Sequence, residues 1–515
     1  MMKNVFFMGI DIGTFSSKGV IIDGTGQVIV RAVCSHGMEN PKPGYYEQDA
    51  EKVWWGDFCH LSRELLEKSG LMPEQIRAVG ASTLGSDCLP VDESCRPLRR
   101  AILYGIDSRS MKEIEELTEY YGEERTRELF GRPMCSGDVA AKILWIRKNE
   151  QEVFRKTYKF LTGSSYIAAK LTGNYVIDLF LGMASFRPFY RPDGSVIQEM
   201  CQPICRPDQL AAGQIVTEPA GRVTRQAACE TGLAEGTLVI TGTGDSSAEA
   251  ISAGVLSPGD MMVQFGSSLF FYCCTDRLIT DDRVRGNNFL IPGTFSVAAG
   301  TNNAGTLQNW YRDQLFPECV KEGEETGENA FALMMRGISE IRPGSDGLIT
   351  LPYFAGERTP INDPDARGVI FGLTLRHTKH HLYRSALEGI AFSIGQHMDI
   401  FSENGLNPER ILAAGGGTKN HLWMQMVADI TGVPVMMAEE TIGASYGDAL
   451  MAAIGAGHYE SFGDLKRVIR IKRTFLPDEE VREAYRPYRA LFDRLYEENK
   501  EIMHRLDSDK SNSPH

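Results

Sequence analysis

A single carboxylate stands in a small-residue turn near the middle of the chain. Residues 239–249 read Val-Ile-Thr-Gly-Thr-Gly-Asp-Ser-Ser-Ala-Glu, so a β-branched run ends in a glycine turn carrying Asp245, and a helix-compatible segment follows. Acids at such junctions tend to face a cleft, because glycines let a ligand approach the backbone closely. Three more glycine turns could face Asp245, at residues 9–18, 264–268 and 414–420. A carboxylate base beside loops that can cradle phosphates indicates phosphoryl transfer.

Each of these features also has an ordinary structural explanation. Asp245 alone could cap a turn, Asp11 could cap a tight hairpin, and the glycines 415–417 could simply connect a strand to a helix. The first turn is not a Walker loop: the spacing from Gly13 reaches Lys18, but the Gly-Lys-Ser/Thr ending is missing. The interpretation as a phosphoryl-transfer site therefore depends on several turns acting together.

The composition excludes several classes of protein. A chain of 515 residues predicts two or more domains, because a single core rarely grows past about 250–300 residues. The formal net charge of −14 argues against a nucleic-acid-binding surface, which needs a basic excess. Eleven cysteines show no metal-ligand spacing, and no run reaches the ~20 apolar residues that span a bilayer. We therefore expect a cytoplasmic protein that binds neither nucleic acid nor membrane.

Apolar runs of strand length lead into the polar turns. Residues 5–10, 19–22 and 27–32 predict a three-stranded meander, which does not suit a dinucleotide fold because the first strand there feeds a helix at once. The predicted strand 76–81 opens into the polar turn 82–87, a position where α/β proteins tend to place ligands. Helical periodicity predicts helices over 111–130, 139–149, 380–402, 421–430 and 479–506.

The strand–glycine turn–strand pattern of residues 5–22 recurs half-way along the chain. Residues 260–272 repeat it, which indicates a duplicated domain with a boundary near 253–259. Chance similarity is the alternative for so short a copy.

Longer motifs spread over nearly the whole chain resemble one family, the FGGY carbohydrate kinases, and within it the xylulokinase-like branch. Residues 368–373 with 381–388 fit the second signature of the family throughout. The first signature is partial, because Lys142-Ile-Leu-Trp145 agrees while Val139 stands where the family prefers Pro, Ser or Thr. Further segments that look like this branch are Tyr45–Asp49 with Trp54-Trp55, Ala355–Pro360, and Gly415–Gly417 with Asn420.

The resemblance implies an α/β protein with two actin-like (ribonuclease H-like) domains around a deep cleft. Residues 1–253 would form a domain that holds the sugar, and residues 254–480 a domain that holds ATP. A C-terminal helix over 481–507 and a disordered tail over 508–515 would follow. The expected activity is transfer of the γ-phosphate of ATP to a sugar hydroxyl, with Mg²⁺ as cofactor.

The resemblance also assigns roles to individual residues. Asp245 matches the catalytic base of the family, and Asp11 matches the acid that reaches magnesium through water. The residues that match nucleotide-contacting positions are Gly13, Thr14, Ser16, Lys18, Gly266, Ser267, Gly305, Asn309, Gly416 and Asn420.

The predicted sugar-binding residues include two departures from the family pattern. Gly85-Ser86-Asp87 stands where xylulokinases carry a Met-His-Gly turn, and Ser246 follows Asp245 where an amide is commoner. Asp87 could accept hydrogen bonds from two adjacent hydroxyls and disfavours an anionic sugar acid. Ser86, Asp87, Asp245 and Ser246 form the expected sugar site. Its substrate stays open among a ketopentose such as D-xylulose, another ketose such as ribulose or erythrulose, and a polyol.

Two other kinds of function compete with an active sugar kinase. A sugar-responsive protein on the kinase scaffold would have lost its base or phosphate loops, yet Asp11, Asp245 and the glycines are present. An actin-like ATPase acting on a protein would lack the sugar-kinase signatures. The assembly stays open, a homodimer included.

Overall fold

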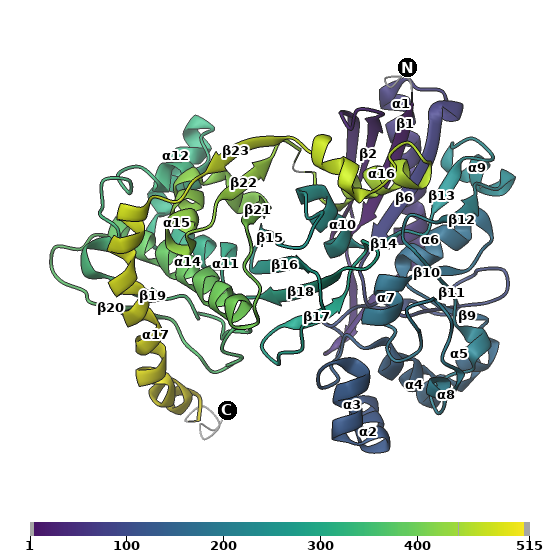
Figure 1. Cartoon of the computed structure of the whole chain (residues 1–515), viewed down its shortest axis with the longest axis horizontal. Helices are drawn as coiled ribbons and strands as arrows, with labels where there is room; N and C mark the ends of the chain where they lie inside the picture. The colour runs from purple at the N-terminus through teal and green to yellow at the C-terminus, as the bar shows by residue number, and fades with distance from the viewer. Residues whose placement is uncertain (1–4, 441, 509–515) are drawn as a thin grey trace.

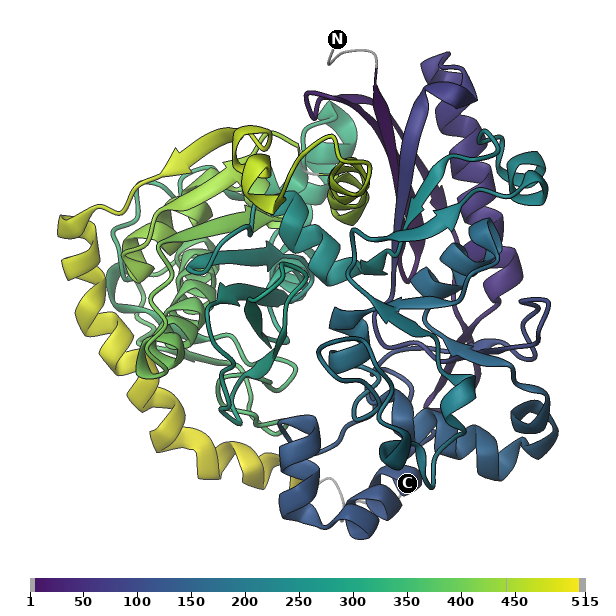
Figure 2. The same cartoon turned by 45° about the vertical axis from the view of Figure 1, so that its right-hand side comes forward.

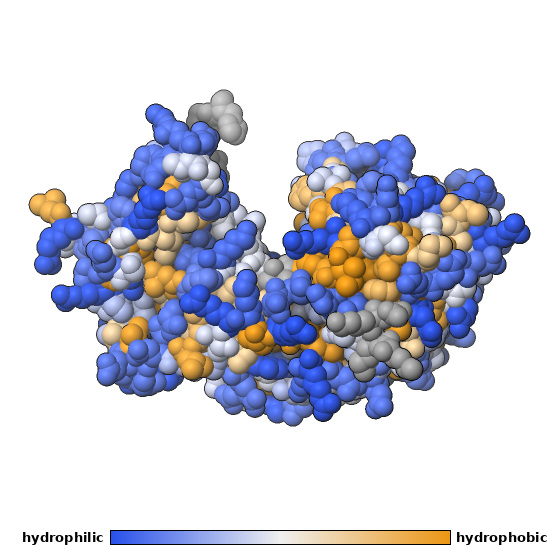
Figure 3. Space-filling view, turned by 90° about the horizontal axis from the view of Figure 1, so that it is seen from above, coloured by the Kyte–Doolittle hydropathy of each residue, from blue (hydrophilic) through white to orange (hydrophobic). Residues whose placement is uncertain are grey.

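The computed structural model describes residues 5–440 and 442–508. Two β-sheets, each covered by helices, form two lobes (Figure 1), and the molecule is hollowed between them when it is seen from above (Figure 3). Within the described ranges, no helix is long and apolar enough to cross a membrane.

The sheet of the first lobe begins with the predicted meander. Neighbouring strands among the three strands β1 (Phe6–Ile12), β2 (Ser16–Asp23) and β3 (Val28–Ser35) are antiparallel. On the other side of β1 lie two strands parallel to it, β6 (Ile76–Thr83) and β13 (Leu238–Ile240), and the antiparallel strand β12 (Pro219–Arg222) forms the edge. Since β1 is buried along its whole length, its apolar run is continuous rather than alternating. The order is β3, β2, β1, β6, β13 and β12, and β14 (Thr243–Gly244) also pairs with β6.

The sheet of the second lobe repeats most of this topology. Its first five strands follow the same order with the same parallel and antiparallel senses, which confirms that residues 260–272 begin a second copy. The order is β18 (Phe295–Gly300), β16 (Leu269–Thr275), β15 (Asp260–Phe265), β21 (Arg410–Ala414), β22 (Val435–Ala438) and β23 (Ile471–Phe475), with β17 (Arg285–Asn288) added beyond β18. The antiparallel edge strand differs, because β12 precedes its neighbour β13 in the chain while β23 follows its neighbour β22.

The remaining elements surround the two sheets. In the first lobe they are β4 (Glu39–Lys42), β5 (Tyr45–Gln48), a π-helical segment (Ala50–Trp55), α1 (Gly56–Ser69), β7 (Leu89–Val91), β8 (Ala101–Ile102), α2 (Met111–Tyr121), α3 (Glu123–Phe130), α4 (Val139–Asn149), α5 (Gln151–Lys156), β9 (Lys159–Leu161), α6 (Gly163–Thr172), β10 (Val176–Asp178), α7 (Leu179–Ala184), α8 (Gln198–Cys201), β11 (Ala212–Gln214), α9 (Arg225–Thr231) and α10 (Asp245–Ala253). Later in the chain they are α11 (Gly305–Leu315), α12 (Pro317–Thr326), α13 (Ala330–Met334), β19 (Ile349–Leu351), β20 (Val369–Phe371), α14 (Lys379–Glu403), α15 (His421–Thr431), α16 (Ala444–Gly455) and α17 (Glu479–Ser508).

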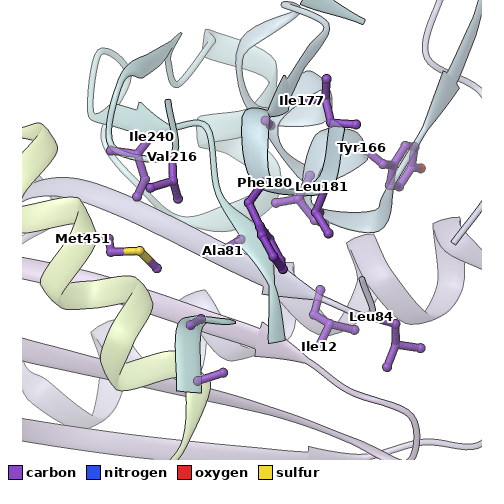
Figure 4. Packing of buried hydrophobic residues seen from close by; sticks show 14 of the residues in the cluster. Ile12, Ala81, Leu84, Tyr166, Ile177, Phe180, Leu181, Val216, Ile240 and Met451 are labelled. Carbon is purple, nitrogen blue, oxygen red and sulfur yellow. The ribbon is translucent and has the colours of Figure 1, made fainter. Parts of the chain in front are cut away.

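Helix α16 belongs to the second part of the chain but packs on the sheet of the first lobe (Figure 2). Glycines allow this close approach: a Cβ at Gly9 would lie 2.0 Å from the Ser445 carbonyl oxygen, and one at Gly447 would lie 2.0 Å from that of Ala248. Figure 4 shows Met451 of α16 in the same buried cluster as Ile240. The chain thus leaves the first lobe after α10 and returns to it with α16. The domain ranges 1–253 and 254–480 stay a prediction.

Two predicted segments differ from the structure. The helix expected over 111–130 is broken at Gly122, whose φ of 81° does not fit a right-handed helix, so α2 and α3 replace it. The C-terminal helix extends through Ser508, which the sequence analysis placed in the disordered tail. Residues 509–515 of that predicted tail lie outside the described residues.

Candidate active site

Two adjoining cavities contain most of the predicted site residues. The larger, of about 840 Å³, lies between the lobes, and the smaller, of about 640 Å³, lies in the second lobe; both are lined by Gly266, Gly416 and Lys419. Predicted residues on the larger cavity are Asp11, Gly13, Thr14, Ser16, Lys18, Asp245, Gly266 and Gly416. Those on the smaller one are Gly266, Ser267, Gly305, Asn309, Gly416 and Asn420. Ser86, Asp87 and Ser246 line neither cavity.

Asp245 is the first residue of α10, directly after the short strand β14. Its Oδ1 accepts a hydrogen bond from the N–H of Ser246 at 2.6 Å. Burial raises the pKa of Asp245 to about 6, and the hydrogen bonds from the helix start oppose that rise. The carboxylate is therefore largely ionised at neutral pH and basic enough to accept a proton.

Asp11 lies at the end of β1 and shares the hydroxyl of Ser82 with a second acid. The Ser82 Oγ donates to Asp448 Oδ2 at 2.6 Å and lies 3.1 Å from Asp11 Oδ1. Burial, followed by the charge of Asp245, raises the pKa of Asp11 to about 8, although Lys18 acts in the opposite direction. The first lobe thus brings an excess of carboxylates to the larger cavity.

The two predicted phosphate turns are each closed by the N–H of their glycine, although the first turn is one residue longer than the second. The N–H of Gly13 donates to the Ser16 carbonyl at 3.1 Å, and the N–H of Gly266 donates to the Ser268 carbonyl at 3.1 Å. Each glycine N–H is therefore used inside its own turn. The glycine N–H groups are therefore not free to bind a ligand, and only the amides that follow them in each turn could do so.

The predicted sugar turn holds a buried acid, Asp87. Among the described residues, no hydrogen bond of ordinary geometry reaches either of its carboxylate oxygens, although the backbone N–H of Tyr104 is close enough to favour the ionised form. Burial raises the pKa of Asp87 well above its usual range, while the nearby charge of Lys142 works against that rise. The Nζ of Lys142 donates to the carbonyls of Ser86 (2.6 Å) and Leu103 (2.7 Å). The charge of Asp245 also raises the pKa of Asp87, so the two acids lie near each other.

The other two predicted sugar contacts, Ser86 and Ser246, differ in whether their hydroxyls are already hydrogen-bonded within the protein. The Ser86 hydroxyl lies 2.9 Å from that of Ser185, so one of its hydrogen bonds is already made. The side chain of Ser246 makes no hydrogen bond that the structure records, whereas its N–H serves Asp245.

Sequence reasoning missed three residues at this site. The hydroxyl of Tyr104 lies 3.3 Å from Thr14 Oγ1 and so connects the sugar side to the first phosphate turn. Glu249 accepts a hydrogen bond from Gln264 Nε2 at 2.6 Å, which connects α10 to β15. Tyr104 ends the short apolar run Ala101-Ile-Leu-Tyr104, and Glu249 lies one helical turn after Asp245, so position alone could have indicated both. The sequence around Asp448 gives no such signal, because its partner Ser82 lies 366 residues earlier in the chain.

Comparison with known proteins gives the same family over both lobes. The model of the N-terminal domain of the FGGY family of carbohydrate kinases matches residues 6–252, and that of the C-terminal domain matches residues 261–456. Xylulose kinase of Bacillus subtilis (strain 168) is 27% identical over 522 residues, which cover 98% of this chain and 100% of that protein. Gluconokinase of the same strain is 27% identical over 495 residues, which cover 95% of each chain.

Solved structures agree in fold. The xylulose kinase from Rhodospirillum rubrum superposes with a TM-score of 0.86 at 28% identity, covering 97% of this chain and 100% of that chain. The glycerol kinase from Plasmodium falciparum superposes with a TM-score of 0.82 at 20% identity, covering 95% and 98%. The fold is therefore the predicted α/β arrangement of two actin-like domains. With both of its domains matched, this chain belongs to the FGGY family of carbohydrate kinases.

Proposed function

We propose that this carbohydrate kinase transfers the γ-phosphate of ATP to a hydroxyl of a neutral ketose, a ketopentose such as D-xylulose, with Asp245 as general base. The observation that carries the proposal is the position of Asp245. It begins helix α10 and lines the larger cavity together with the turns at Gly13 and Gly266, and its charge acts on the buried Asp87.

The chemistry follows from what a hydroxyl needs to attack phosphorus. The sugar oxygen forms a bond to the γ-phosphorus as the bond from that phosphorus to the bridging oxygen breaks, and ADP leaves with the electron pair. The proton of the hydroxyl passes to a carboxylate oxygen of Asp245. Because a hydroxyl is a poor nucleophile, holding it in line with the phosphate supplies much of the rate enhancement.

The nucleotide would occupy both cavities. The turns at Gly13 and Gly266 meet at the larger cavity, where backbone amides can hold phosphate oxygens. The smaller cavity is lined by Phe331 and Met335 together with Asn420, a combination that suits the flat, mostly apolar adenine with its polar edge.

The acid cluster fits a magnesium ion bound largely through water. Four acids line the larger cavity with three lysines, and the acids Asp11, Asp245 and Glu249 come from the first lobe together with only one of those lysines, Lys18. Across the described part of the chain, no three His, Cys, Asp or Glu side chains are grouped as metal ligands. Mg²⁺ keeps several waters and needs only one or two carboxylates beside phosphate oxygens, and Asp11 would be the one that orients those waters. The ion supplies charge neutralisation of the phosphates.

The Asp87 side chain supports a neutral substrate with adjacent hydroxyls. Within the described residues no hydrogen bond of ordinary geometry reaches its two oxygens, and two sugar hydroxyls would supply such bonds. An anionic sugar acid would bring another carboxylate near Asp245, which is ionised at neutral pH, and electrostatic repulsion disfavours that.

The proposal is tested by ADP release from Mg-ATP with ketopentoses, ketohexoses, polyols and gluconate. We expect one neutral sugar to stimulate release strongly, and Asp245→Asn to lose that activity by about 1,000-fold or more while still binding nucleotide. Failure of every sugar, with ATP binding intact and sugars shifting the melting temperature, would favour a sugar-responsive protein. Equal turnover by Asp245→Asn would remove the general base from the mechanism.

Asp87→Asn tests the sugar contact separately. We expect kcat/KM for the neutral sugar to fall by about 10- to 100-fold, because the variant replaces an oxygen that accepts from a sugar hydroxyl by an amide nitrogen that cannot. Ser86→Ala is the matched control in the same turn and should lose less, since that hydroxyl is already paired with Ser185. A larger loss in the Ser86 variant would contradict this assignment.

A further inference from the structure

Three successive carbonyl oxygens of the first phosphate turn are held by residues outside the cavity. The Gly13 carbonyl accepts from His36 Nε2 at 2.9 Å, and the Thr14 carbonyl accepts from Gln48 Nε2 at 3.0 Å. The Phe15 carbonyl accepts from the backbone N–H of His36 at 3.0 Å. His36 and Gln48 do not line the cavity, whereas the turn itself does.

This arrangement determines where the amides of the turn point. In a planar trans peptide, the carbonyl of one residue and the N–H of the next point in opposite directions. With the Gly13 and Thr14 carbonyls directed at His36 and Gln48, the N–H groups of Thr14 and Phe15 are directed at the cavity. Neither amide donates a hydrogen bond to any described residue. Two adjacent donors are thus left for a ligand.

Both nitrogens of the His36 ring lie closest to acceptors, and the Ser17 hydroxyl, 3.4 Å from Nδ1, gives its proton to Asp57. Nε2 lies 2.9 Å from the Gly13 carbonyl oxygen, and Nδ1 lies 2.7 Å from Asp57 Oδ2. The ring must therefore donate from both nitrogens, as an imidazolium does. The Oγ of Ser17 donates to the same Asp57 oxygen at 2.6 Å, which fixes the carboxylate. Because the exposed fractions of the two side chains are only 7% and 17%, water screens this pair weakly.

The titratable groups around His36 are consistent with that charge. Burial opposes the charge, but hydrogen bonds to Asp57 and Gly13 outweigh it and raise the pKa of His36. The pKa of Asp57 is lowered by its hydrogen bonds from His36 and Ser17, against the effect of burial. On β3, burial and Asp57 raise the pKa of the Cys34 thiol to about 12, so this thiol is neutral.

A hydrogen bond from Trp54 fixes the orientation of the Gln48 side-chain amide. The Nε1–H of Trp54 is only a donor and reaches Gln48 Oε1 at 2.9 Å, so the amide nitrogen of Gln48 must face the Thr14 carbonyl. Trp54 is fully buried, which makes the support rigid.

We propose that His36, oriented by Asp57 and assisted by Gln48, is a positioning residue that presents the Thr14 and Phe15 amides to the phosphates of the nucleotide. This inference rests on the proposed function, because it needs a phosphorylated ligand at the turn. It adds a residue that touches no substrate but determines how tightly phosphate is held.

The test compares wild type, His36→Leu and His36→Gln by calorimetric titration with the magnesium complex of the imido analogue of ATP, and with adenosine. We expect His36→Leu to raise the Kd of the ATP analogue by about 10- to 100-fold, because two charge-assisted contacts lose their alignment. The Kd of adenosine, which has no phosphate, should stay unchanged. His36→Gln retains a donor for the Gly13 carbonyl and should stay within about 3-fold of wild type.

The pH dependence gives a readout that a purely structural role would not move. As pH rises through the pKa of His36, the neutral ring keeps one N–H and loses one of its two hydrogen bonds. Affinity of wild type for the ATP analogue should therefore weaken at high pH relative to His36→Gln. Asp11 and the nucleotide titrate in both proteins, so the ratio of the two profiles isolates His36.

Several outcomes would overturn the proposal. They are an unchanged Kd for the ATP analogue in His36→Leu, and a parallel loss of adenosine binding. If His36→Leu does not fold, superimposable pH profiles of wild type and His36→Gln decide against it. A wild-type protein that binds no nucleotide would instead refute the proposed kinase function, and this inference with it.

Discussion

The two walls of the cleft share most of their sheet topology but differ in chemistry. Strands β1 and β15 occupy equivalent places, and Asp11 on the first corresponds to Gln264 on the second. The carboxylate of Asp11 lines the cavity with little compensating charge, whereas the amide of Gln264 is bonded to Glu249. The two lobes therefore share a sheet arrangement, but three of the four acids that line the larger cavity, Asp11, Asp245 and Glu249, come from the first lobe.

The two turns also differ in what supports them. Side chains of His36 and Gln48 hold the first turn. Backbone N–H groups at the start of α11 hold the second: Gly305 donates to the Gly266 carbonyl, and Ala304 and Thr306 donate to that of Ser267. A turn held by side chains responds to charge and pH, while a turn held by backbone responds mainly to steric change.

The largest expected difference between the walls concerns Asp11 and Gln264. Asp11→Asn should lower kcat by about 100-fold or more and raise the magnesium concentration needed for half-maximal rate, because the carboxylate that orients the ion's waters is lost. Gln264→Ala removes only the bond to Glu249 and should cost less than about 10-fold. Steady-state kinetics over a magnesium series compares them, and equal losses would refute the division of roles.

The pH profile tests the charge of the first wall. The pKa of Asp245 is raised to about 6, so its basic form is present above that pH and is lost as pH falls through it. At saturating magnesium, kcat/KM should fall about 10-fold per pH unit below 6. A rate independent of pH between 5 and 7 would show that proton transfer to Asp245 does not limit the reaction.

Steric changes test the second wall. A Cβ at Gly305 would lie 2.6 Å from the Gly266 carbonyl oxygen, whereas one at Gly416 meets no atom within 4 Å. Gly305→Ala should lower the free energy of unfolding by about 1–3 kcal/mol and weaken nucleotide binding. Gly416→Ala should keep the stability of wild type and weaken nucleotide binding alone. Thermal unfolding with and without ADP separates the two, and an unchanged Tm in Gly305→Ala would contradict the packing argument.

The smallest expected effect concerns Asn420, which also caps α15. Its Oδ1 accepts from the Trp423 N–H at 3.0 Å, so Asn420→Ala should cost about 1 kcal/mol of stability as well as nucleotide affinity. Asn420→Asp keeps the cap, loses the amide donor and adds a negative charge. A several-fold rise in the Kd of adenosine at unchanged Tm would identify the adenine contact, and an unchanged Kd would reduce Asn420 to a capping residue.

Much of the candidate site could be predicted from short stretches of the sequence. The turns around Asp11, Asp245, Gly266 and Gly416 could be located because small residues after an apolar strand mark a strand end, and that relation involves only neighbours in the chain. The break at Gly122 was missed because the flanking residues have helical periodicity on both sides, and periodicity does not report the backbone angle of a single glycine.

The sequence by itself determined the two-domain organisation, the family and the position of the acids and glycines along the chain, since these follow from local pattern and motif. Tertiary structure alone decided which side chains meet. It brought His36 to Asp57, Asp87 to Lys142, and α16 back onto the first sheet. Such contacts depend on packing between distant segments, where burial and charge pairing outweigh any preference readable from neighbouring residues.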